Sequence, residues 1–185
     1  MKIILALTGA SGIAYGLRLA EVLKEEELSV VVSDGAKKVM KYESGDAGKT
    51  LNRLRRCGKL YDEGEIDAPP ASGSSRFDAM VVCPCSMKTM SAIANGYGYN
   101  LITRSADVAI KEKRLLVLVP RETPISAIHL ENMLKLSRLG VIILPASPAL
   151  YNRPKNIDDI IDFIVGKILD SLRVDNKLYK RWDAH

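Results

Sequence analysis

The sequence predicts an α/β fold in which a mostly parallel sheet lies between two layers of helices. Apolar runs the length of a strand alternate along the chain with longer segments whose apolar residues recur at the helical period. The runs are continuously apolar, as expected for strands that are buried on both faces. Alternation of this kind is typical of a three-layer α/β domain with helices on both faces of the sheet.

The N-terminal elements follow this alternation closely. Ile3–Leu7 is an apolar run that predicts a buried strand, and helical spacing follows over residues 15–23. A second strand is expected at Leu28–Val32 and a short helix at Gly35–Glu43. Residues 44–76 are rich in glycine, serine and charge, so we expect this stretch to be irregular.

The second half of the chain continues the pattern with three strands and four helices. Strands are expected at 79–82, 115–119 and 141–144, and helices at 87–95, 103–113, 125–139 and 157–172. The last helix carries an unbroken apolar stripe from Ile157 to Leu172, which we expect to pack on the core. A chain of 185 residues that is 47% apolar can bury one good core, so we predict a single domain spanning 1–185.

Composition excludes several classes of partner. The net charge is +5, yet only 5% of residues are aromatic, which does not favour a nucleic-acid surface and fits anionic small molecules such as phosphate esters. No segment approaches the length needed to span a bilayer, and the apolar run at the N-terminus is too short for a signal peptide. Three cysteines do not form a disulfide framework, so we expect a soluble protein of the reducing cytoplasm with no membrane partner.

Polar clusters follow the predicted strands at the point where each strand ends. They are Thr8–Gly12, Ser33, Ser86–Thr89 and Arg121–Thr123, and Tyr151–Arg153 lies a little beyond the fifth strand. Parallel sheets of this kind bind ligands outside the C-terminal ends of their strands. The convergence of these clusters is the strongest functional signal in the pattern.

The first of these clusters, "TGASG", joins a strand to a helix. Such a turn is a tight connection about as often as a phosphate site. The dinucleotide fingerprint would need glycine two and five residues after Gly9, and those positions hold Ser11 and Ala14. The "GDAGKT" of residues 45–50 is not a Walker A loop either, because Glu43 stands where the first glycine is needed. We expect that segment to be a solvated loop.

The cysteines and histidines do not indicate metal or redox chemistry. Cys83 and Cys85 could join Cys57 and His129 around zinc, but a C-x-C spacing matches neither structural zinc sites nor the C-x-x-C redox motif. We expect both to be buried as small apolar residues, and no metal to be bound. His129 is expected to be a partly buried structural residue.

The pair Arg121–Glu122 follows a buried strand and is stiffened by a proline on each side. On an open surface the pair would be a salt bridge of little consequence. In a cleft the arginine could bind an anionic group of a ligand while the glutamic acid donates a proton to it.

Several long stretches of the chain resemble the flavin prenyltransferase (UbiX) family. They are "LALTGASGIAYGLRL", "APPASGSS", "CPCSMKTMSAIANG", the block from Arg104 to Pro154 and the terminal "RW". The resemblance covers nearly the whole chain and is weakest at 44–65. It implies a Rossmann-like fold, a dodecamer and FMN binding without a metal. It also implies transfer of a dimethylallyl group from dimethylallyl phosphate to N5 and C6 of reduced FMN, giving prenylated FMN for UbiD-type decarboxylases.

The resemblance also implies a role for particular residues. FMN would contact Gly9, Ala10, Ser11, Ser33, Ser86, Met87, Lys88, Thr89 and Arg121. The prenyl phosphate would meet Lys111, Tyr151, Lys167 and, from a neighbouring subunit, Arg104. Ser11, Glu43 and Glu122 match positions implicated in proton handling, and Lys111 and Glu122 together would assist departure of the phosphate. The family often has an aromatic residue where Ile66 stands.

Three other functions fit part of this pattern. A flavin-dependent cysteine decarboxylase of similar fold relies on a histidine near the flavin, and no histidine precedes His129. A non-catalytic FMN-binding protein would use the same binding residues but leave Glu122 and the phosphate-seeking cations without a role. An NAD(P)-dependent reductase is disfavoured by the glycine spacing.

Overall fold

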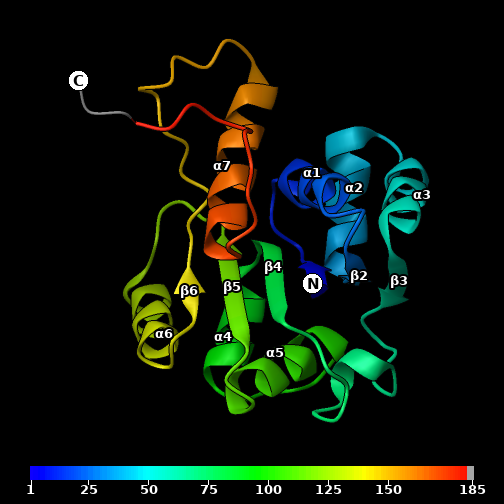
Figure 1. The fold of residues 1–185 in the computed structure, drawn as a ribbon. Coiled ribbons are helices and arrows are strands. Elements are labelled where there is room, and N and C mark those ends of the chain that lie inside the picture. Colours follow the sequence, from blue (N-terminus) through cyan, green and yellow to red (C-terminus); the bar gives the residue numbers. More distant parts are fainter. Residues whose placement is uncertain (183–185) are drawn as a thin grey trace.

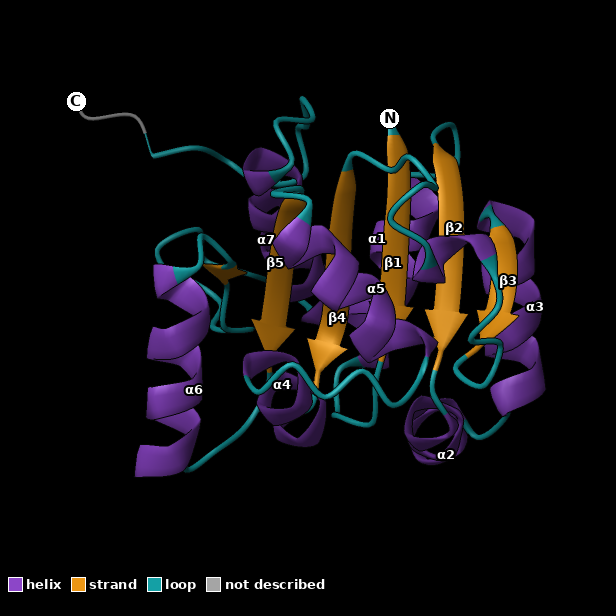
Figure 2. Cartoon of the chain, turned by 90° about the horizontal axis from the view of Figure 1, so that it is seen from below, coloured by secondary structure: helices purple, strands orange, loops and turns teal. Residues whose placement is uncertain are grey.

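A computed structural model describes residues 1–182 of the chain. Six parallel strands form one sheet in the order β3-β2-β1-β4-β5-β6, and the arrowheads of β1 to β5 lie at the same edge (Figure 2). The strands are β1 (Lys2–Leu7), β2 (Glu27–Val32), β3 (Lys59–Asp62), β4 (Ala79–Cys85), β5 (Leu115–Pro120) and β6 (Ile142–Ile143). This is the strand order of the Rossmann fold, so the predicted Rossmann-like fold is confirmed.

Helices cover both faces of the sheet, as predicted. They are α1 (Ile13–Val22), α2 (Asp34–Ser44), α3 (Ala47–Cys57), α4 (Met87–Ala94), α5 (Leu101–Lys111), α6 (Ala127–Arg138) and α7 (Ile157–Ser171), with a 3₁₀ turn at Pro69–Ala71. One core cluster joins the sheet to α1, α2, α3 and α7, and a second joins it to α4, α5 and α6 (Figure 1). Among residues 1–182, no helix combines the length and apolarity that crossing a membrane requires.

Side-chain caps start most of the helices at defined residues. In each case an oxygen of the N-cap side chain accepts a hydrogen bond from the third backbone N–H of the helix, as Ser, Asp and Asn do at this position. The capping residues are Ser33, Asp46, Ser86, Asn100, Ser126 and Asn156. The caps therefore determine at which residue each helix begins, and so which backbone N–H groups face the C-terminal edge of the sheet.

The expectation of an irregular segment over residues 44–76 is wrong in part. This stretch contains helix α3 and the edge strand β3, which pairs with β2. The "GDAGKT" segment is not a loop beyond Asp46, because Asp46 caps α3 and the helix starts at Ala47. The last strand is shorter than predicted, since only Ile142–Ile143 pairs with β5.

The apolar stripe of α7 packs on the core from Ile161 onward. Ile164, Val165, Ile168 and Leu169 are buried and Ile161 is partly buried against the core, whereas Ile157 is exposed. The prediction of core packing therefore fails only at the start of the helix, which extends away from the sheet in Figure 1.

The two cysteines of β4 are fully buried, as predicted, and they pack on opposite faces of the sheet. Cys83 belongs to the core beneath α1 and α7, and Cys85 to the core beneath α4 and α5. Burial raises the pKa of both thiols, that of Cys85 to about 12. Neither side chain is therefore disposed to act as a thiolate or to pair with the other.

Candidate functional site

The site is built at the point where the chain leaves neighbouring strands in opposite directions. After β1 the chain continues into α1 on one face, and after β4 into α4 on the other. Such a switch point opens a crevice outside the carboxyl ends of the strands. Thr8 ties its two sides together, because its hydroxyl donates to the Pro84 carbonyl at 2.8 Å and accepts from the Ser86 N–H at 2.7 Å.

Two helix N-termini meet in this crevice. The N-cap hydroxyl of Ser33 accepts from the Ala36 N–H at 3.0 Å, and that of Ser86 accepts from the Thr89 N–H at 3.3 Å. Both helices start at the arrowhead edge of the sheet (Figure 2). Their N-termini carry partial positive charge and favour an anion between them.

The cavity between these N-termini has a volume of about 190 Å³. It is lined by Gly9, Ser33, Gly35, Glu63, Ser86, Lys88, Thr89 and Tyr99. Five of these are residues assigned to FMN from the sequence. Gly9 and Gly35 approach so closely that a Cβ on Gly9 would lie 3.1 Å from the Gly35 Cα. Any larger residue at these two positions would therefore fill the floor of the cavity.

The start of α1 does not offer its first N–H groups to a phosphate. The Glu43 carboxylate accepts from the Gly12 N–H at 2.8 Å and from the Ile13 N–H at 2.9 Å. Gly12 adopts φ +105°, a conformation that L side chains rarely take. Glu43 thus serves as the cap of α1. A second carboxylate, that of Glu63, accepts from the Asp34 N–H at the start of α2, so an anion would be met mainly by the start of α4 and the hydroxyl groups of the cavity.

Arg121 and Ser11 come together at the edge of the same crevice. The Arg121 Nε donates to the Ser11 carbonyl at 3.5 Å, which joins the end of β5 to the turn after β1. Glu122 is exposed, and its carboxylate accepts from the neighbouring Thr123 N–H at 3.0 Å. Within residues 1–182 there is no ion pair between Arg121 and Glu122, so the salt bridge considered from the sequence does not form.

The remaining residues assigned to FMN lie at the rim or behind it. Ala10 is buried at the turn, and Met87 packs against the core beneath α4. Lys88 is exposed, with its Nζ 5.7 Å from the centre of the Tyr99 ring.

Sequence reasoning missed Glu63 and Tyr99. One Glu63 oxygen accepts from the Asp34 N–H at 2.8 Å, and the other accepts a short hydrogen bond from the Asn100 side chain. Glu63 therefore links the starts of α2 and α5 beside the cavity. It directly follows β3, so the strand-end rule would have found it had that strand been recognised.

Lys111 lies at the opposite edge of the sheet from Glu122. It ends α5 and precedes β5, whereas Glu122 follows β5, and the six residues of this strand span about 20 Å. Arg104 is one turn into α5, where its Nη1 donates to Asp107 at 3.3 Å. One chain therefore does not bring Lys111 to the Arg121–Glu122 edge.

Tyr151 and Lys167 belong to a separate group around α7. The Tyr151 ring meets those of Phe163 and Trp182 edge-on at 6.3 and 5.1 Å. The Lys167 Nζ is 5.9 Å from the centre of the Tyr179 ring. These side chains form an aromatic surface with a cation beside it, and they lie on elements that do not line the 190 Å³ cavity.

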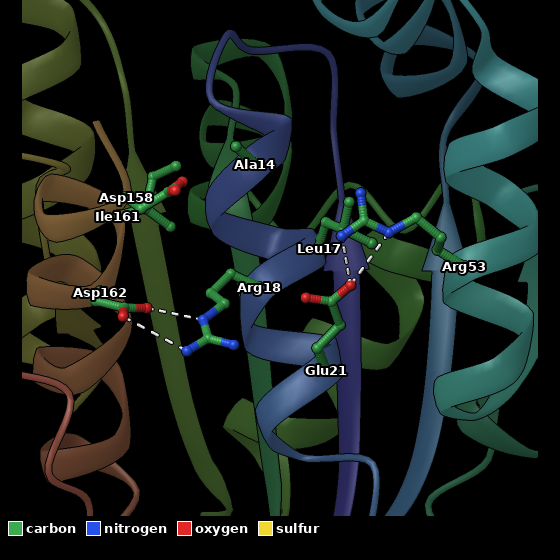
Figure 3. Close-up of a pocket in the computed structure, with 8 residues that line it drawn as sticks. All are labelled: Ala14, Leu17, Arg18, Glu21, Arg53, Asp158, Ile161 and Asp162. Carbon is green, nitrogen blue, oxygen red and sulfur yellow. Dashed lines mark hydrogen bonds and ion pairs between the residues drawn. The ribbon is translucent and has the colours of Figure 1, made fainter. Parts of the chain in front are cut away.

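A larger groove of about 480 Å³ lies over α1, between α3 and α7 (Figure 3). Its two arginines already have partners. Arg18 donates to Asp162 at 2.7 Å, and Arg53 donates to Glu21 at 2.6 Å. Because the charges of both arginines are paired within the chain, this groove is a weaker candidate for binding an anionic ligand than the strand-end cavity.

The strand-end cavity fits the phosphate end of a flavin nucleotide. It offers hydroxyl groups, two helix N-termini and a lysine, which suit an anionic group linked to a polyol. His129 is occupied elsewhere: it is the third residue of α6, and its Nδ1 accepts from the Ser126 N–H at 3.3 Å. The sequence expectation of a partly buried structural histidine is confirmed. Among residues 1–182, no group of three His, Cys, Asp or Glu side chains is placed as metal ligands would be.

Known proteins resemble this chain over its full length. The profile of the Flavoprotein family matches residues 1–169. The flavin prenyltransferase UbiX of Methanocaldococcus jannaschii is 54% identical over 98% of both chains. A structure of a dodecameric FMN-dependent UbiX-like decarboxylase from Escherichia coli O157:H7 has a TM-score of 0.94 at 41% identity, covering 100% of both chains.

Two other solved structures bear on the choice between related activities. AnUbiX, solved in complex with FMN and dimethylallyl pyrophosphate, has a TM-score of 0.93 at 41% identity and covers 99% of this chain and 97% of its own. Peptidyl-cysteine decarboxylase EpiD has a TM-score of 0.64 at 19% identity, covers 93% and 97%, and shares the fold alone. The chain belongs to the flavin prenyltransferase (UbiX) family.

Proposed function

We propose that this protein is a flavin prenyltransferase that joins a dimethylallyl group from dimethylallyl phosphate to N5 and C6 of reduced FMN. The observation that carries the proposal is the meeting of two capped helix N-termini in one cavity, next to the Arg121–Glu122 edge. All six strands belong to one sheet, which supports a single flavin-binding domain over 1–185.

The residues of the cavity would bind and orient the flavin. Ser33, Ser86 and Thr89 would donate hydroxyl hydrogen bonds to its phosphate, and Lys88 would offset the phosphate charge. Gly9 keeps the floor open so that the backbone can approach the ligand. When bound, reduced FMN supplies the two nucleophilic atoms, N5 and C6.

The Arg121–Glu122 edge would handle the departing phosphate. Arg121 would offset the charge that develops on the leaving oxygen, and Glu122 would donate a proton to it. The Ser11 carbonyl accepts from Arg121, and Glu43 accepts from the neighbouring Gly12 N–H, which supports a role for Ser11 and Glu43 in taking up the proton that the flavin releases.

The donor site would be completed by other copies of the chain. Lys111 cannot reach Glu122 within one chain, and Arg104, Tyr151 and Lys167 lie on other surfaces of it. We propose a dodecamer, as reported for the Escherichia coli relative, in which these cations surround the donor phosphate.

The product would serve a UbiD-type decarboxylase. This recipient and a location in the cytoplasm are implied by the family resemblance. The three cysteines, all present as free thiols, are in keeping with a reducing compartment. No metal enters the proposed chemistry.

The test is conversion of reduced FMN by the purified protein under anaerobic conditions, with dimethylallyl phosphate and dimethylallyl pyrophosphate in separate reactions. Mass spectrometry of the extracted flavin should show one added dimethylallyl group with at least one donor. Bound but unmodified flavin with both donors would contradict the proposal and favour a non-catalytic FMN-binding protein.

A further inference from the structure

One carboxylate on α7 gathers the C-terminal tail, residues 174–182. Asp170 accepts from the Tyr179 hydroxyl, from Nη2 of Arg181 at 2.8 Å and from the Asn176 side-chain amide at 3.0 Å. Lys167 adds a second cation, with its Nζ 3.6 Å from the same carboxylate. The Asp170 side chain is only 19% exposed, so it is a partly buried hub for four side chains.

The surface of α7 is shaped to seat this tail. A Cβ on Gly166 would lie 2.5 Å from Cδ1 of Tyr179 and 3.0 Å from Oδ1 of Asn176. The Gly166 carbonyl also accepts from the Asn176 side-chain amide at 3.3 Å. Glycine one turn before Asp170 thus leaves the notch in which the tail packs.

The docked tail reaches residues assigned to the donor phosphate. Trp182, adjacent to Arg181 in the chain, meets the Tyr151 ring edge-on at 5.1 Å. Lys167, which is also assigned to the donor phosphate, lies near the tail as well, because its Nζ is 3.6 Å from the Asp170 carboxylate and 5.9 Å from the centre of the Tyr179 ring. Loss of the Asp170 charge would free both the tail and the Lys167 side chain.

We infer that Asp170 is a positioning residue, which docks the C-terminal tail on α7 and so holds Tyr151 and Lys167 in place for the phosphate of the prenyl donor. The inference rests on the proposed function. Asp170 does not line the strand-end cavity, so it acts on the donor and leaves the flavin site intact. A long side chain fixed before the ligand arrives loses less conformational entropy on binding.

The test compares Asp170→Asn with Asp162→Asn in the full-length protein. Asp162 lies on the same helix and pairs with Arg18 at 2.7 Å, so its replacement removes an ion pair of α7 without touching the tail. Trp182 is the single tryptophan of the chain, and its fluorescence anisotropy in the flavin-free protein reports on docking of the tail.

Asp170→Asn should lower the Trp182 anisotropy and raise the KM for dimethylallyl phosphate about tenfold, which corresponds to about 1.4 kcal/mol. The turnover number and the Kd for FMN should change by less than about threefold, which corresponds to about 0.65 kcal/mol. Asp162→Asn should leave the anisotropy and the KM at wild-type values. Asp170→Glu, which keeps the charge, should restore part of the lost affinity.

Gly166→Ala provides a second variant that changes no charge. Alanine favours the helix, but its methyl group would displace Tyr179, so the anisotropy should fall and the KM should rise as for Asp170→Asn. An unchanged KM in a protein whose Trp182 has become mobile would overturn the inference, as would an unchanged anisotropy in Asp170→Asn. A wild-type protein that makes no prenylated flavin would instead contradict the proposed function.

Discussion

At the scale of single residues, the proposed reaction depends most on Glu122. Its carboxylate is exposed at the end of β5 and is held only by a bond to the adjacent Thr123 N–H among residues 1–182. A carboxylate held by no other group of the described chain can turn toward a ligand without disturbing the fold. This freedom suits a group that acts on a ligand better than a structural residue.

Glu122→Gln should therefore impair prenyl transfer without affecting flavin binding. The amide keeps the shape of the side chain but has no transferable acidic proton, so the single-turnover rate should fall by about 10²–10⁴. Mass spectrometry of the flavin measures the rate, and fluorescence quenching measures FMN affinity. Glu25→Gln, in the exposed turn after α1, serves as the control and should keep the wild-type rate. A Glu122→Gln rate within about fivefold of wild type would remove Glu122 from the mechanism.

Tyr179 makes docking of the C-terminal tail sensitive to alkaline pH. Burial, together with its hydrogen bond to Asp170, raises the pKa of Tyr179 from 10.0 to about 12. The raised pKa means that the folded state prefers the neutral phenol. Its contribution to stability is fully present below pH 10 and is lost as the pH rises through the folded pKa.

We expect the Trp182 anisotropy to fall between about pH 10 and 12 as the tail is released. Charged neighbours that face the Tyr179 ring are Asp170, Lys167 and Arg181. Tyr179→Phe removes the phenol and leaves these neighbours, so the alkaline transition should disappear. A transition of the same size in Tyr179→Phe would show that the phenol is not its cause.

At the scale of elements, the sequence predicted those with strong apolar patterns and missed those stabilised by packing. The buried strands β1, β2, β4 and β5 are continuous apolar runs, and each was predicted. Helix α3 has only a narrow apolar side, and β3 is a four-residue edge strand that begins with a lysine. Tertiary contacts with α1, α2 and β2 stabilise these two, and no local pattern reports such contacts.

The helix caps divide into those that also serve the site and those that only start a helix. Ser86→Ala and Ser126→Ala should each lower the free energy of unfolding by about 1 kcal/mol, since each removes an N-cap acceptor. Only Ser86→Ala should also weaken FMN binding, by about tenfold or more, because a hydrogen bond to a charged group contributes about 1.5–3 kcal/mol. Urea denaturation and FMN titration measure the two quantities. Equal FMN affinities in the two variants would place the flavin phosphate elsewhere.

At the scale of the whole molecule, one chain carries only part of the proposed site. Its own topology brings together Gly9, Ser33, Ser86 and Thr89, and the strand-end rule was sufficient to predict this group. The same rule places Lys111 at the wrong edge of the sheet for the reaction. No pattern within one chain could show how other copies meet it, so the donor side could be predicted only from the family resemblance.

The exposed apolar side of α6 is the surface where we expect another copy to bind. Leu130 and Leu134, one turn apart, are both more than half exposed, and Leu136 is the only fully buried residue of this helix. The helix starts five residues after Glu122, so a contact here would place a second chain next to the Arg121–Glu122 edge. Isolated apolar side chains on a surface are ordinary, but neighbouring ones on the same face of a helix favour an interface.

Leu134→Glu should therefore dissociate the assembly, because a carboxylate buried in an apolar contact without a partner is strongly unfavourable. Light scattering should show a smaller particle, and prenyl transfer should fall about 10²-fold or more, as expected when catalytic groups lose their position. FMN binding should persist, since the cavity is formed within one chain. Lys49→Glu, an exposed charge change on α3, should keep both the particle size and the rate. A fully active monomer would show that each chain completes its own donor site, and Lys111 would then have no part in the reaction.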